Sequence, residues 1–389
     1  MRPDARVQSA IDLLDAIILA ARDGGAAADV IASRFFKTRR YAGSADRRAI
    51  RDLAWAAIRR FGERPANGRA AMLALADGDA ALAAHFTGAA HAPATIDGGE
   101  ARATGAAVPQ WLMPHIDPRI DAGEQAALLE RAPLDLRLNR ARLSDIVLPE
   151  GAALGAPIDG LRLPHDSDVA AHPAVIAGAA VVQDAASQYV ASLCDAPRHR
   201  VILDLCAGAG GKTLALAAAN PDAHIIACDI DRSRLQRLAP RAEQMGATNI
   251  ETRLLNPGQE LAMLADLVGR LDLLLIDAPC SGSGTWRRNP EGRWRLTPKR
   301  LTSLTDAQAR LLDIAGKLLA GRGTLVYAVC SLLHDEGEGQ VRRWLNANPD
   351  WQGDWPQDWA LGRVSGVGRI LTPHHDGCDG FFVARLRCR

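Results

Sequence analysis

"RVILDLCAGAGGKTLALAAANPDAHIIACDI", residues 200–230, is the stretch that decides the fold, because its apolar pattern changes twice. A continuous apolar run ends in a glycine-rich turn, an amphipathic helix pattern follows, and a second apolar run ends at Asp229. Continuous apolar strands separated by helices are typical of a parallel sheet that is covered on both faces. The stretch therefore predicts the first strand, helix and strand of an α/β domain.

The same alternation continues toward the C-terminus. Two further apolar runs, "LDLLLIDAP" (271–279) and "GTLVYAVCS" (323–331), flank an amphipathic helix pattern and predict two more parallel strands. Ligands of such sheets bind at the carboxyl ends of the strands. We therefore expect the functional residues in the turns that follow these runs.

Two further parts precede the α/β domain. Apolar residues recur at helical spacing over residues 6–86, and residues 87–108 are rich in Gly, Ala and Pro, as a linker is. Short strands are expected at 134–139, 160–164 and 180–184, which indicates a small α/β subdomain. The predicted domains are 1–105 (helical, with the linker), 106–182 (small α/β) and 183–389 (large α/β).

The composition is that of a globular protein. The chain has 389 residues, 48% hydrophobic and 23% charged, and no apolar run is long enough to cross a bilayer. No signal-peptide cleavage pattern follows the first helix, so we expect a cytoplasmic protein with no membrane contact. None of the seven cysteines is at C-x-x-C spacing, which argues against a disulfide framework or a zinc site. We expect no metal, and we interpret His374 and His375 as loop residues.

Arginine is concentrated near the N-terminus. Residues 34–64 hold ten Lys or Arg against three acids, with Phe35, Phe36, Tyr41 and Trp55 between them. This pattern fits a solvated helix face as well as a nucleic-acid-binding surface, and both interpretations stay open at this point.

The glycine turn "DLCAGAGGKT" (204–213) indicates a nucleoside site. The phosphate-binding loop of nucleoside triphosphatases needs a glycine five residues before Gly211, and that position is Cys206. Asp229 lies 21 residues after Gly208, at the end of the next strand, where an acid can accept hydrogen bonds from a ribose. The glycine spacing of dinucleotide sites is absent, so a dinucleotide is disfavoured. A purely structural turn is the alternative.

Two cysteines end neighbouring predicted strands. Cys280 follows Asp277-Ala278-Pro279, and Cys330 follows Tyr327-Ala328-Val329. A single strand cysteine is usually an inert small hydrophobe. Adjacent parallel strands would bring these two thiols to one edge of the sheet, beside the expected nucleoside site, which predicts a reactive pair.

A basic and aromatic segment follows Cys280. Its arginines could contact RNA phosphates and its tryptophans could stack on bases, although a surface loop with packed tryptophans is the alternative. The residues are Trp286, Arg287, Arg288, Arg293, Trp294, Arg295 and Arg300.

Taken together, these motifs resemble the RsmB (Fmu, Sun-like) RNA cytosine-5 methyltransferases. The resemblance covers the last half of the chain, and a looser one links the helical region to that family's NusB-like RNA-binding domain. It implies a Rossmann-like class I methyltransferase domain with a mostly parallel sheet, preceded by the helical domain and an RRM-like α/β subdomain. The matching segments are "VQDAASQ" (182–188), 204–213, "DAPCSG" (277–282), "RNPE" (288–291), "YAVCS" (327–331) and "DGFF" (379–382).

The resemblance also implies a cofactor and its ligands. S-adenosyl-L-methionine would be held by the glycine turn, with Asp229 at the ribose and Asp277 near both cofactor and base. Asn256 stands where the family usually has an acid near the adenine, and Val329 stands where it usually has Thr. The turn itself has Ala-Gly-Ala-Gly in place of the common Ala-Ala-Pro-Gly. Its implied cofactor-binding residues are Cys206, Ala207, Gly208, Ala209, Gly210, Gly211 and Lys212.

Cytosine methylation gives two thiols and an acid distinct tasks. Carbon 5 of cytosine becomes nucleophilic only after a thiolate adds to carbon 6, and an acid at N3, which we take to be Asp277, stabilises the adduct. By resemblance Cys330 attacks and Cys280 assists release. Chemistry alone does not order them, because DNA cytosine-5 methyltransferases attack from the Pro-Cys position.

The implied substrate class is 16S ribosomal RNA, with an unstacked cytosine as the target. A transfer RNA cytosine-5 methyltransferase is the nearest alternative. A methyltransferase acting on DNA or protein, and a non-catalytic RNA-binding ribosome assembly factor, are the others.

Overall fold

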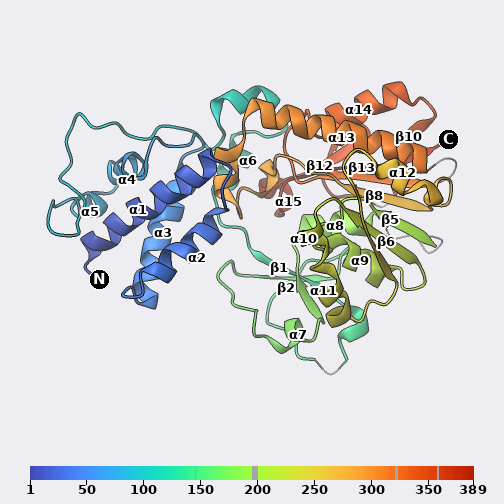
Figure 1. Cartoon of the computed structure of the whole chain (residues 1–389), viewed down its shortest axis with the longest axis horizontal. Helices are drawn as coiled ribbons and strands as arrows, with labels where there is room; N and C mark the ends of the chain where they lie inside the picture. The colour runs from blue at the N-terminus through green and yellow to red at the C-terminus, as the bar shows by residue number, and fades with distance from the viewer. Residues whose placement is uncertain (145, 195–199, 320–322, 357–358) are drawn as a thin grey trace. The chain divides into compact units, whose positions relative to one another are not determined.

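The computed structural model describes residues 1–144, 146–194, 200–319, 323–356 and 359–389. The chain divides into two compact units, residues 1–130 with 285–298 and residues 131–284 with 299–389 (Figure 1). The expected helical N-terminal region and the expected α/β fold are both confirmed. The predicted boundaries of three domains stay a prediction.

The first unit is built on five helices whose apolar faces meet. Leu14 and Ile17 from the first helix pack with Ile58 from the third in one buried cluster. Gly68 lets the fourth helix approach the first closely, since a Cβ there would lie 2.3 Å from the Ile11 carbonyl oxygen. The helices are α1 (Pro3–Arg22), α2 (Ala28–Thr38), α3 (Ser44–Arg60), α4 (Gly68–Ala76) and α5 (Ala80–Ala83).

Residues 285–298 complete the core of this helical unit. Trp294 is 2% exposed, packs in the helical cluster and donates from Nε1 to the Phe61 carbonyl at 2.8 Å. Arg293 is 1% exposed, and its guanidinium donates to the carbonyls of Ile58 and Arg59 at 2.9 and 2.7 Å. The last carbonyls of a helix have no intrahelical partner, so a cation there satisfies them.

The interpretation of this segment as an RNA-contacting surface is therefore wrong for four of its seven residues. Their burial leaves no face for a base or a phosphate, and the packed-tryptophan alternative holds instead. The four buried residues are Trp286, Arg287, Arg293 and Trp294, whereas Arg288 and Arg295 are half-buried and Arg300 is exposed.

The second unit begins with a small antiparallel sheet of four strands. Its order is β2-β3-β1-β4, which confirms the three expected short strands and adds β2. Asp135 accepts two hydrogen bonds from Arg162 and one from the Ala185 N–H at 3.0 Å, which ties the sheet to the start of α8. The strands are β1 (Leu134–Leu138), β2 (Ala152–Ala153), β3 (Gly160–Leu163) and β4 (Ala180–Val182), and α8 is Ala185–Ser192.

The large sheet has nine strands. Five are parallel in the order β7-β6-β5-β8-β9, and β13 continues the sheet antiparallel to β9. Sequence patterns predicted four of the parallel strands, β5, β6, β8 and β9, and missed β7 and the four C-terminal strands. The strands are β5 (Val201–Asp204), β6 (His224–Asp229), β7 (Ile250–Leu254), β8 (Leu273–Asp277), β9 (Thr324–Val329), β10 (Trp351–Gly353), β11 (Arg363–Ser365), β12 (Gly368–Leu371) and β13 (Phe381–Cys388).

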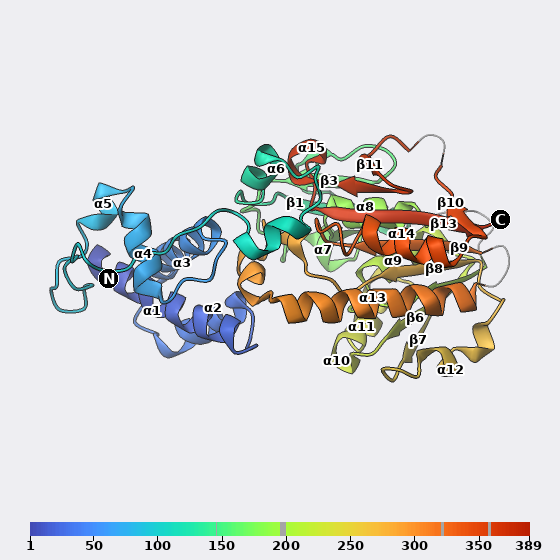
Figure 2. The same ribbon diagram turned by 90° about the horizontal axis from the view of Figure 1, so that it is seen from above.

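Helices cover both faces of this sheet (Figures 1 and 2). Leu273 and Leu275 of β8 pack in the cluster with α8 and α9, whereas Leu274 and Ile276 pack with α13 and α14. Side chains of a strand alternate between faces, so a strand buried on both sides is apolar throughout. The helices are α9 (Gly211–Ala219), α10 (Arg232–Leu235), α11 (Leu238–Met245), α12 (Glu260–Met263), α13 (Pro298–Leu318) and α14 (Glu338–Ala347).

The strand order creates a topological switch point at β5. The chain runs outward through β6 and β7, then returns to the other side of β5 as β8. The loops that follow β5 and β8 therefore run in opposite directions. Ligands of such sheets bind between these loops, at the carboxyl ends of the two strands. This is where the glycine turn and Asp277 stand.

Two smaller features complete the fold. His374 and His375 belong to a one-turn helix, α15 (Pro373–Asp376), rather than to an irregular loop, so that expectation is corrected. No helix among the described residues is long and apolar enough to span a membrane. The remaining short helices are α6 (Ala122–Ala127), α7 (Pro173–Ile176) and 3₁₀ turns, one of which is Pro290–Arg295.

Replacement of Trp294 tests the place of residues 285–298 in the helical core. Trp294→Ala should lower the free energy of unfolding by about 3 to 5 kcal/mol, because it leaves a large cavity. Leu19→Ala, at a half-exposed position of α1, is the control and should cost no more than about 0.5 kcal/mol. Thermal denaturation followed by circular dichroism measures both. Equal melting temperatures for the two variants would contradict the packing described above.

Candidate functional site

The glycine turn between β5 and α9 is shaped for close approach of a ligand. Gly208 and Gly210 have φ of +56° and +83°, a region that favours glycine, and a Cβ on Gly210 would lie 2.1 Å from Leu238 Cδ1. A Cβ on Gly211 would meet nothing within 4 Å. The N-terminus of α9, whose first N–H groups have no intrahelical acceptor, therefore opens onto free space.

Asp229 fixes this turn from the end of β6. Its side chain is buried, Oδ2 accepts from the Gly208 N–H at 2.7 Å, and Oδ1 accepts from the Asp231 N–H at 2.7 Å. Each carboxylate oxygen can accept a second hydrogen bond, so Asp229 keeps capacity for hydroxyl groups of a ligand. Asn256 is exposed just after β7, and its amide nitrogen lies 3.4 Å from Gln259 Oε1.

Two buried side chains, Gln183 and Arg137, support the turn through consecutive hydrogen bonds. Gln183 donates to the Gly211 carbonyl at 3.2 Å and accepts from Arg137 Nε at 2.7 Å. Burial lowers the pKa of Arg137 to about 10, with Arg241 adding to the effect. Sequence reasoning gave Gln183 and Arg137 no role. The "VQDAASQ" segment (182–188) was the available signal, but its contact with the turn is tertiary.

Lys212 and Asp277 form an ion pair at the switch point. Lys212 Nζ lies 2.7 Å from Asp277 Oδ2 and 5.0 Å from the centre of the Phe381 ring. Burial alone would lower the pKa of Lys212, but the charge and hydrogen bond of Asp277 raise it. The lysine is therefore held as an ammonium group at the edge where the two cysteines lie.

Cys280 and Cys330 are in contact. The adjacent parallel strands β8 and β9 pair Asp277 with Ala328, and the two sulfur atoms that follow lie 3.3 Å apart. The expectation that both thiols meet at one edge is confirmed. The hydrogen bond with Cys330 and burial raise the pKa of Cys280 well above its usual value, so Cys280 is the thiol that keeps its proton.

The other cysteines are free thiols in apolar surroundings, as expected. Cys194, Cys228 and Cys378 are buried, and burial raises the pKa of Cys228 to about 12. Cys206, in the glycine turn, also has a strongly raised pKa, first through burial and then through nearby carboxylates. It is therefore an unreactive thiol that lines the turn.

The arginine-rich segment of the first unit presents its charges to solvent. Four of its five aromatic residues are core residues, and the fifth, Tyr41, is 69% exposed. Arg39 and Arg51 lie over the rings of Phe35 and Trp55, at 3.6 and 4.4 Å from their centres. The exposed cations are Arg34, Lys37, Arg40, Arg48, Arg51, Arg60 and Arg64.

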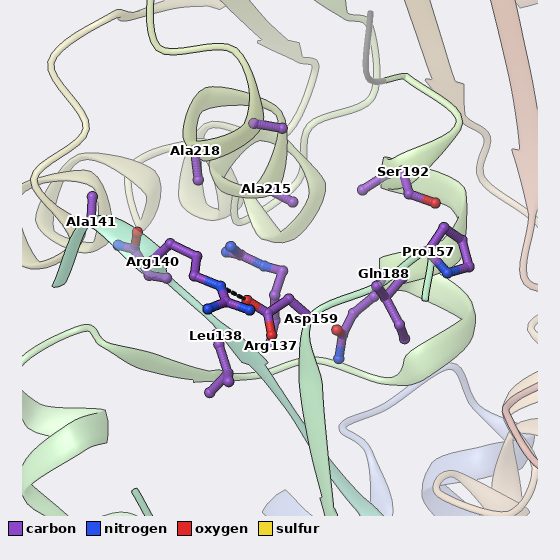
Figure 3. A pocket seen from close by; sticks show the side chains of 14 residues that line it. Arg137, Leu138, Arg140, Ala141, Pro157, Asp159, Gln188, Ser192, Ala215 and Ala218 are labelled. Atoms are coloured by element: carbon purple, nitrogen blue, oxygen red, sulfur yellow. Dashed lines mark hydrogen bonds and ion pairs between the residues drawn. The ribbon is translucent and has the colours of Figure 1, made fainter. Parts of the chain in front are cut away.

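A cavity of about 330 Å³ lies elsewhere in the second unit (Figure 3). Its wall comes from β1, α8, α9 and residues 157–159, and Arg140 pairs with Asp159 beside Arg137. Its lining residues do not include Cys280, Cys330, Asp229 or Asp277. The candidate site residues therefore lie at the switch point and not in this cavity.

Comparisons with known proteins agree with this geometry. A family model described as "16S rRNA methyltransferase RsmB/F" matches residues 191–387. A "Probable ribosomal RNA small subunit methyltransferase B" from Synechocystis is 35% identical over 302 residues, which is 72% of this chain and 66% of that protein. The "Ribosomal RNA small subunit methyltransferase B" of Xylella fastidiosa is 36% identical over 296 residues, covering 72% and 67%. The match thus spans about two thirds of each relative's length.

One solved structure shares the fold over almost the whole chain. The crystal structure of PH0851 superposes with a TM-score of 0.75, covers 99% of both chains and is 20% identical in sequence. At this identity the likeness concerns the fold.

Asp204, at the end of β5, predicts a pH dependence of stability. It is buried, accepts from Thr213 Oγ1 at 2.7 Å, and has no described partner at Oδ1. Burial raises its pKa to about 7 from 3.8, so the folded state holds a proton that the unfolded state releases. The contribution of this proton to the free energy of unfolding is complete below about pH 4 and is lost as pH rises through 7.

Asp204→Asn should remove this dependence, because the amide is neutral at every pH. The free energy of unfolding of the variant, measured by denaturant titration, should gain on that of the parent by about 1.4 kcal/mol per pH unit between about pH 4 and pH 7. Thr213→Ser, which keeps the hydroxyl donor, is the control. Parallel curves for Asp204→Asn and the parent would contradict the assignment.

Proposed function

The chain belongs to the RsmB/F family of 16S rRNA methyltransferases, and from that premise we propose that it methylates carbon 5 of a cytosine through a covalent enzyme–RNA adduct. It is an RNA methyltransferase whose methyl donor is S-adenosyl-L-methionine. One observation carries the finer proposal: two thiols 3.3 Å apart share a sheet edge with the glycine turn and Asp277. A methyltransferase that uses direct transfer needs no such pair.

The residues at the switch point fit the cofactor. The glycine turn is held open by positive φ angles, and the start of α9 faces free space at Gly211. Asp229 would accept hydrogen bonds from the ribose hydroxyls, Asn256 would hydrogen-bond near the adenine, and Asp277 would lie near both cofactor and base. The bound cofactor supplies an electrophilic methyl group. The turn residues proposed to hold it are Cys206, Ala207, Gly208, Ala209, Gly210, Gly211 and Lys212.

The proposed reaction uses the two thiols in sequence. The Cys330 thiolate adds to carbon 6 of the base, and the electron pair of the carbon 5–carbon 6 bond then forms the new bond from carbon 5 to the methyl group. Asp277 stabilises the adduct by hydrogen bonding at N3. Transfer of the carbon 5 proton to water restores the carbon 5–carbon 6 double bond and expels the Cys330 thiolate, a step that Cys280 assists.

The proposed substrate is 16S ribosomal RNA, the substrate that the family description names. A thiol can reach carbon 6 only when the base is unstacked, so the target is an exposed or extruded cytosine. The exposed cations of residues 34–64 would contact phosphates, which gives affinity without sequence preference. We place this reaction in the cytoplasm.

Asp229→Ala tests the cofactor site. It removes the acceptor proposed for the ribose hydroxyls and should weaken S-adenosyl-L-methionine binding about ten- to a hundredfold, measured by calorimetry. Asp231→Ala, two residues away with an exposed carboxylate, is the control and should bind normally. Unchanged affinity in Asp229→Ala would overturn the assignment.

The two cysteines should give opposite phenotypes. Cys330→Ala should abolish both methyl transfer and the covalent species, because no adduct forms. Cys280→Ala should still transfer methyl but fail to release, and should accumulate a protein–RNA band that survives denaturing gel electrophoresis and is fullest with cofactor present. Cys206→Ala should alter cofactor affinity and trap nothing.

Two outcomes would change this picture. A band that accumulates in Cys330→Ala and disappears in Cys280→Ala would make the Pro-Cys thiol the nucleophile. Full activity in both variants would rule out the covalent reaction.

A further inference from the structure

Glu336 is a fully buried carboxylate beside the two cysteine-bearing loops. It is 0% exposed, its Oε1 accepts from the Ser281 N–H at 2.8 Å, and its Oε2 accepts from Ser331 Oγ at 2.5 Å. Gln308 of α13 donates to Oε1 as well, at 3.1 Å. Ser281 directly follows Cys280 and Ser331 directly follows Cys330, so one side chain holds both loops.

Serine hydroxyl groups add further hydrogen bonds between the two cysteine-bearing loops. Ser331 Oγ lies 3.2 Å from Ser281 Oγ and 3.1 Å from Ser283 Oγ, which in turn accepts from the Leu332 N–H at 2.8 Å. The Tyr327 hydroxyl donates to the Glu336 carbonyl at 2.7 Å and fixes its backbone. Glu336 is thus held rigidly, and the position of one thiol relative to the other depends on it.

The groups around the Glu336 carboxylate are hydrogen-bond donors. Oε1 accepts from two N–H groups and the short bond from Ser331 is typical of a hydroxyl on a charged oxygen. In the described part of the chain no lysine or arginine nitrogen forms an ion pair with it. A buried carboxylate acts more strongly on its neighbours than an exposed one, because the protein interior screens charge less than water does.

The charge of Glu336 acts on the Cys280 thiol. Glu336 adds to the effects of the Cys330 hydrogen bond and of burial that raise the pKa of Cys280. Lys212, by contrast, interacts favourably with Cys330. The other titratable groups that face the pair are Tyr327 of β9, beside Cys280, and Asp277, which is paired with Lys212.

We propose that Glu336 is a positioning residue that holds Cys280 and Cys330 in contact and keeps the proton on Cys280. The buried carboxylate therefore decides which thiol attacks, a choice that the chemistry of cytosine methylation leaves open. The role of Glu336 in turnover rests on the proposed function. Its effect on the two thiols does not, because it is expected in the protein without RNA or cofactor.

The closing experiment labels the thiols without RNA or cofactor. The full chain is treated with limiting iodoacetamide at neutral pH, and mass spectrometry of peptides gives the ratio of Cys330 to Cys280 labelling. The parent should be labelled mainly on Cys330. Glu336→Gln keeps the shape, since its amide can donate to Ser331, and should shift the ratio toward Cys280 by about tenfold, the effect of one pKa unit.

Two further variants separate charge from fold. Glu338→Gln removes a half-buried carboxylate two residues away whose ion pairs are with His334 and Arg342 and not with Ser281 or Ser331, and it should leave the ratio unchanged. Glu336→Asp keeps the charge and should keep the preference for Cys330. Circular dichroism checks that each variant folds. An unchanged ratio in folded Glu336→Gln, or a shift in Glu338→Gln of the same size, overturns the proposal.

Turnover gives the second readout. Glu336→Gln should lower kcat with unaltered cofactor affinity, because the glycine turn and Asp229 are untouched, and Glu336→Asp should recover part of kcat. A parent protein that never methylates cytosine would overturn the proposed function and leave the labelling result standing. A normal kcat in Glu336→Gln would overturn the role of Glu336 in turnover.

Discussion

The position of β8 between β5 and β9 is the constraint on which the site depends. Its pairing with β5 opens the switch-point crevice beside the glycine turn, and its pairing with β9 brings Cys280 to 3.3 Å from Cys330. Parallel pairing with both neighbours sends all three carboxyl ends to one edge. Segments 65 and 50 residues apart in sequence thus meet, Lys212 with Asp277 and Cys280 with Cys330.

Buried polar side chains then hold the loops that the strands bring together. Asp229 holds the glycine turn, Gln183 supports it through the Gly211 carbonyl, and Glu336 joins the two cysteine loops. A buried polar group is costly unless it is hydrogen-bonded, so each of these side chains favours one loop conformation over others. The apolar sheet supplies stability, and these groups supply the accuracy that a site needs.

The chain also uses the segment after Cys280 to complete the helical unit. It leaves the second unit at Gly284, contributes Trp294 and Arg293 to the first, and returns at Lys299. A tryptophan and an arginine in a loop looked like nucleic-acid contacts in sequence. The burial of Trp294 against Phe61, 233 residues away in sequence, cannot be read from the local pattern, because a packed loop and an RNA-binding loop can share the same pattern of arginine and tryptophan.

The sequence by itself determined four of the five parallel strands, the glycine turn, the acid at Asp229 and the presence of two cysteines at strand ends, because each of these follows from local periodicity and spacing. Only the tertiary structure decided that Cys280 and Cys330 touch, that Arg293 and Trp294 are core residues, and that Glu336 lies between the thiol loops. The C-terminal strands, of which β13 pairs antiparallel to β9, also escaped sequence patterns. The physical reason is that these features depend on strand register and on burial, which are set by contacts between residues far apart in the chain.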